Sequence, residues 1–238
     1  MSSDQKIIFT KDNLRQYLKA LGKEFRRLNG TSVPAEIILV GGAAILANYD
    51  FREMTTDMDA LIYASSSMKD AINHVGDVYG LPNGWLNSDF KNTLSYSQKL
   101  DEVSVYYGTF SNVLRVRTLS AEYLVAMKLR SGRRYKNDLS DIVGILSEHQ
   151  KKGTPLTKEK IMYAVAFLYG NWNAISEHSQ IFIDDLFRVT DYEKIYLDSV
   201  ADEKLARASL IEFEDNHPGV TTESNVDDIL NSLKPKKF

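Results

Sequence analysis

The sequence predicts an α+β fold, with a small β-sheet flanked by helices and a C-terminal helical region after it. Short runs rich in β-branched and aromatic residues, typical of strands, occur only in the first part of the chain. Amphipathic helical patterns surround these runs, and helical patterns alone continue after Gly153. Because Thr154 and Pro155 are typical of a linker, we expect a first domain over residues 1–150 and a helical C-terminal domain over residues 151–238.

Capping residues, turns and periodicity predict the elements of the first domain. Thr10 can cap a first helix, which Asn29-Gly30 ends. Later helices are expected to begin near Ser65, after Ser120 and after Asn137. Strands are expected over residues 37–40, 58–63, 103–110 and 114–119, the last two joined by a hairpin turn at Ser111-Asn112.

Composition and charge exclude several classes of site. The formal net charge of −3 and the pI near 5.9 give no overall basic field, so any nucleic-acid binding must use a local patch. The chain has no cysteine, which excludes disulfides, thiol catalysis and cysteine-ligated zinc. The N-terminal segment lacks the pattern of a signal peptide, and no apolar run approaches the roughly 20 residues that span a bilayer. We therefore expect a soluble, cytoplasmic protein without a membrane partner.

The most informative stretch runs from Glu36 to Tyr63. Its first β-branched run ends at Gly41-Gly42, and a helical pattern resumes directly after the two glycines. Glycines at a strand-to-helix joint allow a sharp turn and a close approach of a ligand to the main chain, while the new helix presents unpaired N–H groups to an anion. This combination suits phosphate, although a diglycine by itself is also an ordinary turn.

Asp57 and Asp59 lie at the start of the next predicted strand. Residues i and i+2 of a strand point to the same face, so the two carboxylates are expected to project together while Met58 enters the core. Like charges held this close repel unless a cation lies between them, and hard oxygen ligands suit Mg²⁺ or Mn²⁺. The pair is a candidate metal site, and an ordinary strand entry is the alternative.

Taken together, the diglycine and the aspartate pair resemble the signature of the nucleotidyltransferase superfamily of the DNA polymerase β type. In that superfamily a Gly-Gly or Gly-Ser turn precedes an Asp-x-Asp strand, and Gly41, Gly42, Asp57 and Asp59 match this signature in order. The resemblance implies that residues 1–150 form a nucleotidyltransferase domain with a small mixed β-sheet. It also implies that the glycines bind the triphosphate of an NTP and that the aspartates bind catalytic metal ions. We add the neighbouring hydroxyl of Thr56 as a candidate nucleotide-binding group.

A second cluster of charged residues follows in two predicted helices. Lys128 falls at the margin of an apolar helical stripe, where it can face a polyphosphate or simply extend along the surface with its stem buried. Asp138 and Asp141 lie one turn apart in the next helix, where capping and helix-dipole pairing also explain them. The segment concentrates cationic groups of the kind that triphosphate binding requires: Lys128, Arg130, Arg133, Arg134 and Lys136.

This second pattern is similar to the abortive-infection toxin branch of the superfamily and to related bacterial proteins of unassigned role. In that branch a helix lysine and an aspartate of the later helix are needed for activity. The resemblance, which covers roughly residues 36–146, therefore implicates Lys128 and Asp138 as catalytic residues, with Asp141 as the alternative. Lys128 and Arg133 are the candidate nucleotide-binding residues of this segment.

The sequence leaves the third acidic group open. Related enzymes often carry a third carboxylate on the central strands, and neither of the last two predicted strands contains one. Asp89, Asp138 or Asp141 can fill this role or act as general base, although Asp89 is also explained as a turn-capping residue. Arg115 and Arg117 share one face of the last strand, where they line either a phosphate-binding cleft or a solvated sheet surface.

These residues predict a metal-dependent nucleotidyltransferase that moves an NMP from an NTP to an acceptor hydroxyl. The toxin branch implies an RNA end as acceptor, a role in a toxin–antitoxin or phage-defence system, and a cognate antitoxin as partner. A protein hydroxyl is the other favoured acceptor, and a small molecule of the aminoglycoside type is an alternative. A protein that binds a nucleotide or a partner without catalysis is the competing hypothesis, because the central strands lack a carboxylate.

Overall fold

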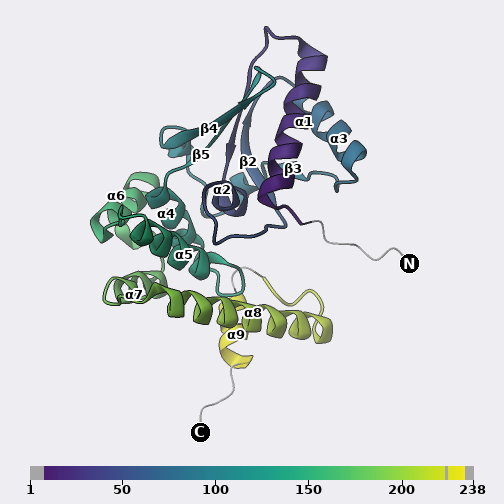
Figure 1. Cartoon of the computed structure of the whole chain (residues 1–238). Helices are drawn as coiled ribbons and strands as arrows, with labels where there is room; N and C mark the ends of the chain where they lie inside the picture. Colours follow the sequence, from purple (N-terminus) through teal and green to yellow (C-terminus); the bar gives the residue numbers. More distant parts are fainter. Residues whose placement is uncertain (1–7, 223–224, 234–238) are drawn as a thin grey trace.

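The computed structural model describes residues 8–222 and 225–233. Its strands are β1 (Ala35–Leu39), β2 (Met58–Tyr63), β3 (Leu86–Asn87), β4 (Ser104–Phe110) and β5 (Leu114–Leu119). Its α-helices are α1 (Lys11–Asn29), α2 (Gly41–Asn48), α3 (Ser67–Tyr79), α4 (Ala121–Ser131), α5 (Asp138–Lys151), α6 (Lys158–Tyr169), α7 (Glu177–Leu186), α8 (Tyr192–Asn216) and α9 (Val226–Leu233). The predicted α+β fold is confirmed (Figure 1).

The strands form one mixed sheet in the order β3-β2-β1-β5-β4. β1 runs parallel to β5 and β2 runs parallel to β3, while the β1–β2 and β4–β5 pairs are antiparallel. Ser111 and Asn112, with φ of 52° and 60°, form the predicted hairpin turn between β4 and β5. The sequence patterns missed β3, because two residues are too short to show a strand periodicity.

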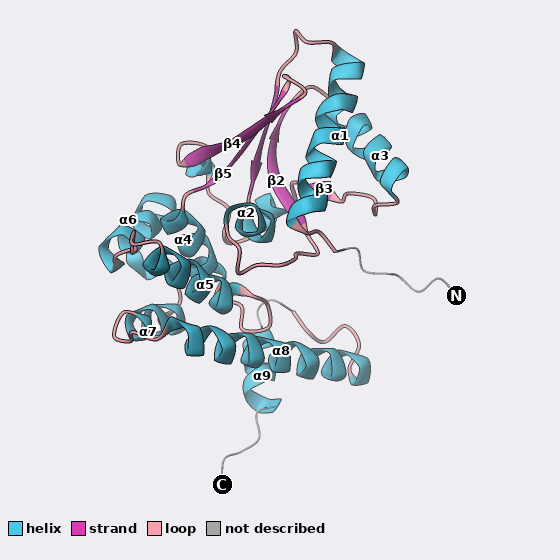
Figure 2. Ribbon diagram, viewed as in Figure 1, coloured by secondary structure: helices cyan, strands magenta, loops and turns pink. Residues whose placement is uncertain are grey.

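Helices α1 and α3 lie side by side on one face of the sheet (Figure 2). The predicted cap is present, since the Thr10 hydroxyl accepts a hydrogen bond from Asn13 N and the helix ends at Gly30. One apolar stripe of α1 enters the core, and α1 approaches the sheet so closely that a Cβ on Gly22 would lie 2.9 Å from Phe110 Cβ. The buried apolar residues of this stripe are Leu14, Leu18, Leu21 and Phe25.

Helices α4 to α9 gather beyond one end of the sheet, with α2 between them and the strands (Figure 1). Among the described residues, a single buried apolar cluster extends from α1 through the sheet to α7. The apolar residues around positions 195–200 and 205–213 belong to one continuous helix, α8, because the chain between them contains no helix-breaking residue. No helix in the described part of the chain is both long enough and apolar enough to cross a membrane.

Candidate functional site

The diglycine begins helix α2 directly after strand β1. Gly41 has a positive φ of 55°, and a Cβ placed on Gly42 would lie 2.5 Å from Thr55 Oγ1. A side chain at position 42 would therefore collide with Thr55, so the close packing of this turn requires glycine. A Cβ on Gly41 would lie 3.8 Å from Asp59 Oδ2. The turn thus lies directly beside one of the two candidate metal ligands.

Asp57 and Asp59 flank the first residue of β2. Met58 is fully buried, Asp59 is half-buried and Asp57 is exposed. Burial and the charge of Asp57 raise the pKa of Asp59, and the charge of Asp89 acts in the same direction. Lys136 and Arg133 oppose this shift, so their charges also reach the aspartate pair.

The oxygen donors of the aspartate pair are of the type that a divalent cation prefers. Among the described residues, no cationic side chain makes an ion pair with Asp57 or Asp59. No group of three or more described His, Cys, Asp or Glu residues is placed to hold a metal ion. Two carboxylates suit Mg²⁺, which commonly takes one or two carboxylates and completes its octahedral shell with phosphate oxygens and water. The same oxygen donors suit Mn²⁺.

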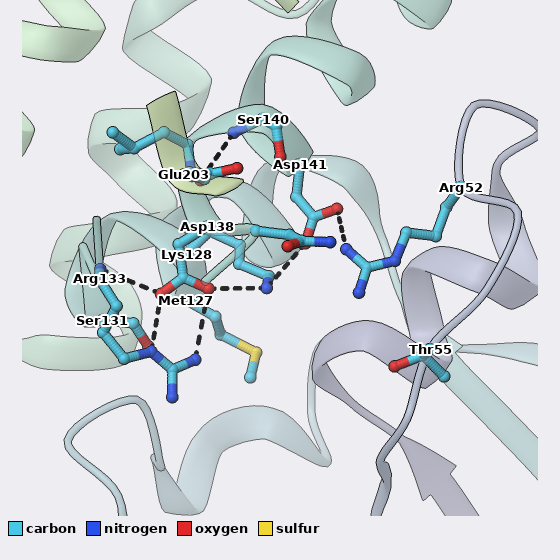
Figure 3. A network of polar contacts seen from close by, with 12 residues as sticks. Arg52, Thr55, Met127, Lys128, Ser131, Arg133, Asp138, Ser140, Asp141 and Glu203 are labelled. Carbon is cyan, nitrogen blue, oxygen red and sulfur yellow. Dashed lines mark hydrogen bonds and ion pairs between the residues drawn. The ribbon is translucent and has the colours of Figure 1, made fainter. Parts of the chain in front are cut away.

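A buried ion network lies beside this pair, between helices α4 and α5 (Figure 3). Lys128 Nζ lies 2.8 Å from Asp138 Oδ1 and 2.8 Å from Asp141 Oδ2. The contact with Asp138 is a hydrogen bond, whereas Asp141 Oδ2 makes an ion pair without hydrogen-bond alignment. The main-chain N–H of Arg133 donates to Asp138 Oδ2 at 3.1 Å, and its Nε donates to the same oxygen at 2.9 Å.

The network fixes the charge states of its members. Burial alone would raise the pKa of Asp138, but the charges of Lys128 and Arg133 outweigh burial and lower the pKa to about 2. Burial alone would lower the pKa of Lys128, but Asp138 and Asp141 outweigh it and raise the pKa above its ordinary value. Lys128 is therefore a buried ammonium ion whose charge two carboxylates already balance.

Arg52 completes the network and was missed by the sequence analysis. Its Nη1 donates to Asp141 Oδ1 at 2.6 Å, and its Nε donates to Met54 O at 2.8 Å. Its guanidinium also approaches the diglycine, because a Cβ on Gly42 would lie 3.4 Å from Nη2. Arg52 thus connects the diglycine turn to helix α5. The only signal in the sequence was an arginine shortly before the aspartate pair, in a segment without periodicity.

Glu203 of α8 is a second residue that the sequence analysis missed. It is 2% exposed, and its Oε1 accepts hydrogen bonds from the main-chain N–H groups of Leu139 (2.8 Å) and Ser140 (3.2 Å). The side chain of Asn137, which precedes α5, makes no capping hydrogen bond to this helix. Glu203 therefore caps the helix that carries both aspartates of the network. Burial raises the pKa of Glu203 to about 7.

The other predicted residues lie at different places. Arg117 makes ion pairs with Glu36 and Asp101, and Arg115 lies 3.6 Å from Glu36. These contacts agree with the prediction of a solvated sheet surface, and neither arginine belongs to the network. Asp89 is exposed at the start of a 3₁₀ turn after β3, close enough for its charge to act on Asp59.

Two of the predicted cations make polar contacts outside the network. Arg134 donates to Asn231 of α9 at 2.8 Å, and Arg130 donates to Leu94 O at 3.3 Å. The Thr56 hydroxyl donates to Asp57 Oδ2 at 3.2 Å.

Two cavities accompany these elements. One of about 770 Å³ lies along α3 and the end of β2, and neither glycine of the turn nor either aspartate of the pair lines it. A smaller one of about 90 Å³ is lined by Arg133, Ser95 and Tyr135, with Val226 and Asp227 of α9 closing one side. The small cavity adjoins the network through Arg133.

A comparison with protein families gives one match that covers both charged clusters. The model of a family described as "Nucleotidyltransferase of unknown function (DUF6036)" matches residues 16–149, from within α1 to the last turn of α5. No curated protein and no solved structure gives a match.

Proposed function

This chain belongs to the DUF6036 nucleotidyltransferases of unknown function, and from this membership we propose that it transfers an NMP from an NTP to an acceptor hydroxyl in a metal-dependent reaction. The observation that carries the proposal is the approach of Gly41 to Asp59, since a Cβ there would lie 3.8 Å from Oδ2. A phosphate-binding turn and a pair of carboxylates that make no ion pair with any described cationic side chain then share one site.

The roles follow from the position of each group. Main-chain N–H groups of Gly41 and Gly42 at the start of α2 face the triphosphate, because a helix N-terminus attracts anions. Asp57 and Asp59 hold Mg²⁺ or Mn²⁺, which when bound neutralises phosphate charge and favours ionisation of the acceptor hydroxyl. Arg133, whose charge reaches Asp59, adds a cation beside the polyphosphate.

In this proposal the buried network orients the site. Both network aspartates lie 2.8 Å from Lys128 Nζ, so Lys128 holds α4 and α5 together rather than offering a free charge. Asp138 is a poor general base, because its pKa of about 2 leaves little affinity for a proton near neutral pH. Asp89 is exposed and acts on Asp59, so it is the better candidate for the third acidic group.

The charge around the pair favours an anionic acceptor over a polycationic one. Lys136 and Arg133 act on Asp59, and Arg130 and Arg134 lie in the same segment. Such a border attracts an RNA end or an acidic surface of a protein and repels an aminoglycoside. A toxin role with a cognate antitoxin is consistent with an RNA or protein acceptor and extends the proposal.

Incubation with each labelled NTP, Mg²⁺ and either total RNA or total protein tests the proposal. The wild-type protein is expected to label one acceptor pool, and the Asp57→Ala/Asp59→Ala variant to label none. Asp77→Ala is the matched control, because Asp77 lines the cavity on α3, to which neither the diglycine nor the aspartate pair contributes. Label that persists in the double variant would show that the site is misassigned.

A second candidate is a protein that binds a nucleotide without transferring it. Strands β4 and β5 favour it, because neither carries a carboxylate that could serve as the third acidic group, and both arginines of β5 pair with Glu36. Calorimetry with ATP and Mg²⁺ beside the labelling assay separates the two functions. Binding that depends on Asp59, without pyrophosphate release, would favour the second candidate.

A further inference from the structure

Helix α8 lies outside the segment that the family model matches, yet it contacts the site at three points. Tyr196, Glu203 and Arg207 are spaced by seven and then four residues, which places them on one face of the helix. This face packs against α5 (Figure 1). Part of α8 docks through apolar contacts, since Tyr192, Ile195 and Tyr196 pack against the main apolar cluster. Leu197, Leu205 and Ile211 of the same helix stay more than half exposed.

The first contact acts on Arg52 through its neighbour Phe51. The Tyr196 hydroxyl donates to Phe51 O at 3.3 Å, and the two rings pack edge to face with centroids 5.8 Å apart. The Phe51 ring also lies directly on α5, because a Cβ on Gly144 would approach it to 2.5 Å. The segment that carries Arg52 is thus held between α5 and α8.

The second contact is the cap that Glu203 provides to α5 (Figure 3). Its Oε1 accepts from Leu139 N and Ser140 N, which are two of the N–H groups that a helix start leaves without an internal partner. Its other oxygen, Oε2, is buried and makes no hydrogen bond of good geometry in the described structure. A carboxylate buried without a cation costs free energy, so a helix that merely docked would be served better by an apolar residue.

The third contact fixes the turn before α5. Arg207 Nη2 donates to Asn137 Oδ1 at 2.6 Å, and its Nε donates to Tyr135 O at 3.1 Å. Asn137 is the residue that precedes the helix, so its side chain is held by α8 instead of capping α5 itself. Arg207 and Glu203 together determine where α5 begins, and both network aspartates lie in its first turn.

We propose that α8 is a positioning element of the nucleotidyltransferase site, and that Glu203 is the positioning residue through which it holds Asp138 and Asp141 against Lys128. This inference rests on the proposed function only for its activity readout. Glu203 touches neither the aspartate pair nor the diglycine, and it acts through the first turn of α5.

Hydrogen exchange and transfer measurements on matched variants test this inference. Glu203→Met fills a similar volume without an acceptor oxygen, while Glu203→Gln keeps an acceptor. We expect the amides of Leu139 and Ser140 to exchange about tenfold faster in Glu203→Met, as for the loss of one helix cap, and at the wild-type rate in Glu203→Gln. We expect NMP transfer, measured well below the melting temperature of every variant, to fall with the faster exchange. Glu193→Ala, an exposed residue of the same helix, is the control.

The outcomes separate the two proposals. The positioning role would be overturned if the amides of Leu139 and Ser140 exchanged in Glu203→Met at the wild-type rate. It would also be overturned if Glu203→Met and Glu203→Gln transferred NMP equally well. If the wild type transfers nothing, the proposed function fails, and the exchange rates still decide whether Glu203 holds α5. If Glu203→Met does not fold, Arg207→Gln replaces it, because this variant releases Asn137 without changing Glu203. The amides of Leu139 and Ser140 are then expected to exchange faster in Arg207→Gln. An unchanged exchange rate of these amides would overturn the role of α8.

Discussion

Arg52 Nη1 lies 2.6 Å from Asp141 Oδ1, although 89 positions separate the two residues in the chain. Their side chains are 13% and 2% exposed, so this is a largely desolvated pair. It joins the segment after α2 to helix α5 and thereby links the diglycine turn to the buried network. Removing Arg52 leaves Asp141 with Lys128 as its remaining cationic partner among the described residues, and removing Asp141 takes away the carboxylate that Arg52 contacts.

The first prediction concerns this pair. We expect Arg52→Gln to lower the free energy of unfolding by about 3 kcal/mol, near the lower end of the cost of breaking a buried pair, because Lys128 Nζ still lies 2.8 Å from Asp141 Oδ2. Asp141→Asn added to Arg52→Gln is expected to recover part of this loss, because the carboxylate that lost Arg52 is then gone and Lys128 keeps its pair with Asp138. Urea denaturation of both single variants and the double variant measures the coupling. Arg188→Gln, which breaks an exposed pair with Asp185, serves as control and is expected to cost far less.

The second prediction concerns acid stability. The pKa of Asp138 is lowered to about 2, so its contribution to stability is present above its unfolded pKa near 3.8 and is lost as the pH falls through about 2. The shift corresponds to about 2 kcal/mol. In Lys128→Met the charge that holds Asp138 ionised is missing, so we expect a less stable protein at pH 7 and a smaller further loss between pH 4 and pH 2. Denaturant titrations at these pH values measure both effects, and parallel pH curves for the two proteins would contradict the assignment.

The third prediction concerns the diglycine turn. Gly42→Ala is expected to weaken binding of a Mg²⁺–NTP complex, because its Cβ would lie 2.5 Å from Thr55 Oγ1 and must displace the segment before Asp57. Thr55→Ala in the same protein removes that oxygen and is expected to restore part of the affinity. Calorimetry measures both variants. Gly108→Ala is the matched control, since its Cβ would meet only Phe110 at an ordinary distance of 3.5 Å.

The sequence predicted what depends on neighbouring residues. A few adjacent positions were enough to predict the cap of α1 and the turn at Ser111-Asn112. The same holds for the diglycine and the aspartate pair and for their order. Arg52 and Glu203 were missed because their roles arise only when distant segments meet, and a carboxylate in a helix such as α8 is expected to face solvent. The partners of Lys128 became clear for the same reason only in three dimensions.

The last prediction concerns the pH dependence of Glu203. Burial raises its pKa to about 7, against the opposing effect of the Ser140 side chain and of the N–H groups of Ser140 and Leu139, and the charge of Asp141 adds to the rise. The folded-state pKa of Glu203 lies above the unfolded value near 4.5, so protonation of Glu203 stabilises the fold. This contribution to the free energy of unfolding is fully present below pH 4.5 and is lost as the pH rises through about 7. We therefore expect the wild type to lose stability relative to Glu203→Gln between pH 5 and pH 8, by at most about 3 kcal/mol. Paired urea titrations across this range measure the difference, and a difference that does not change with pH would show that Glu203 stays ionised throughout.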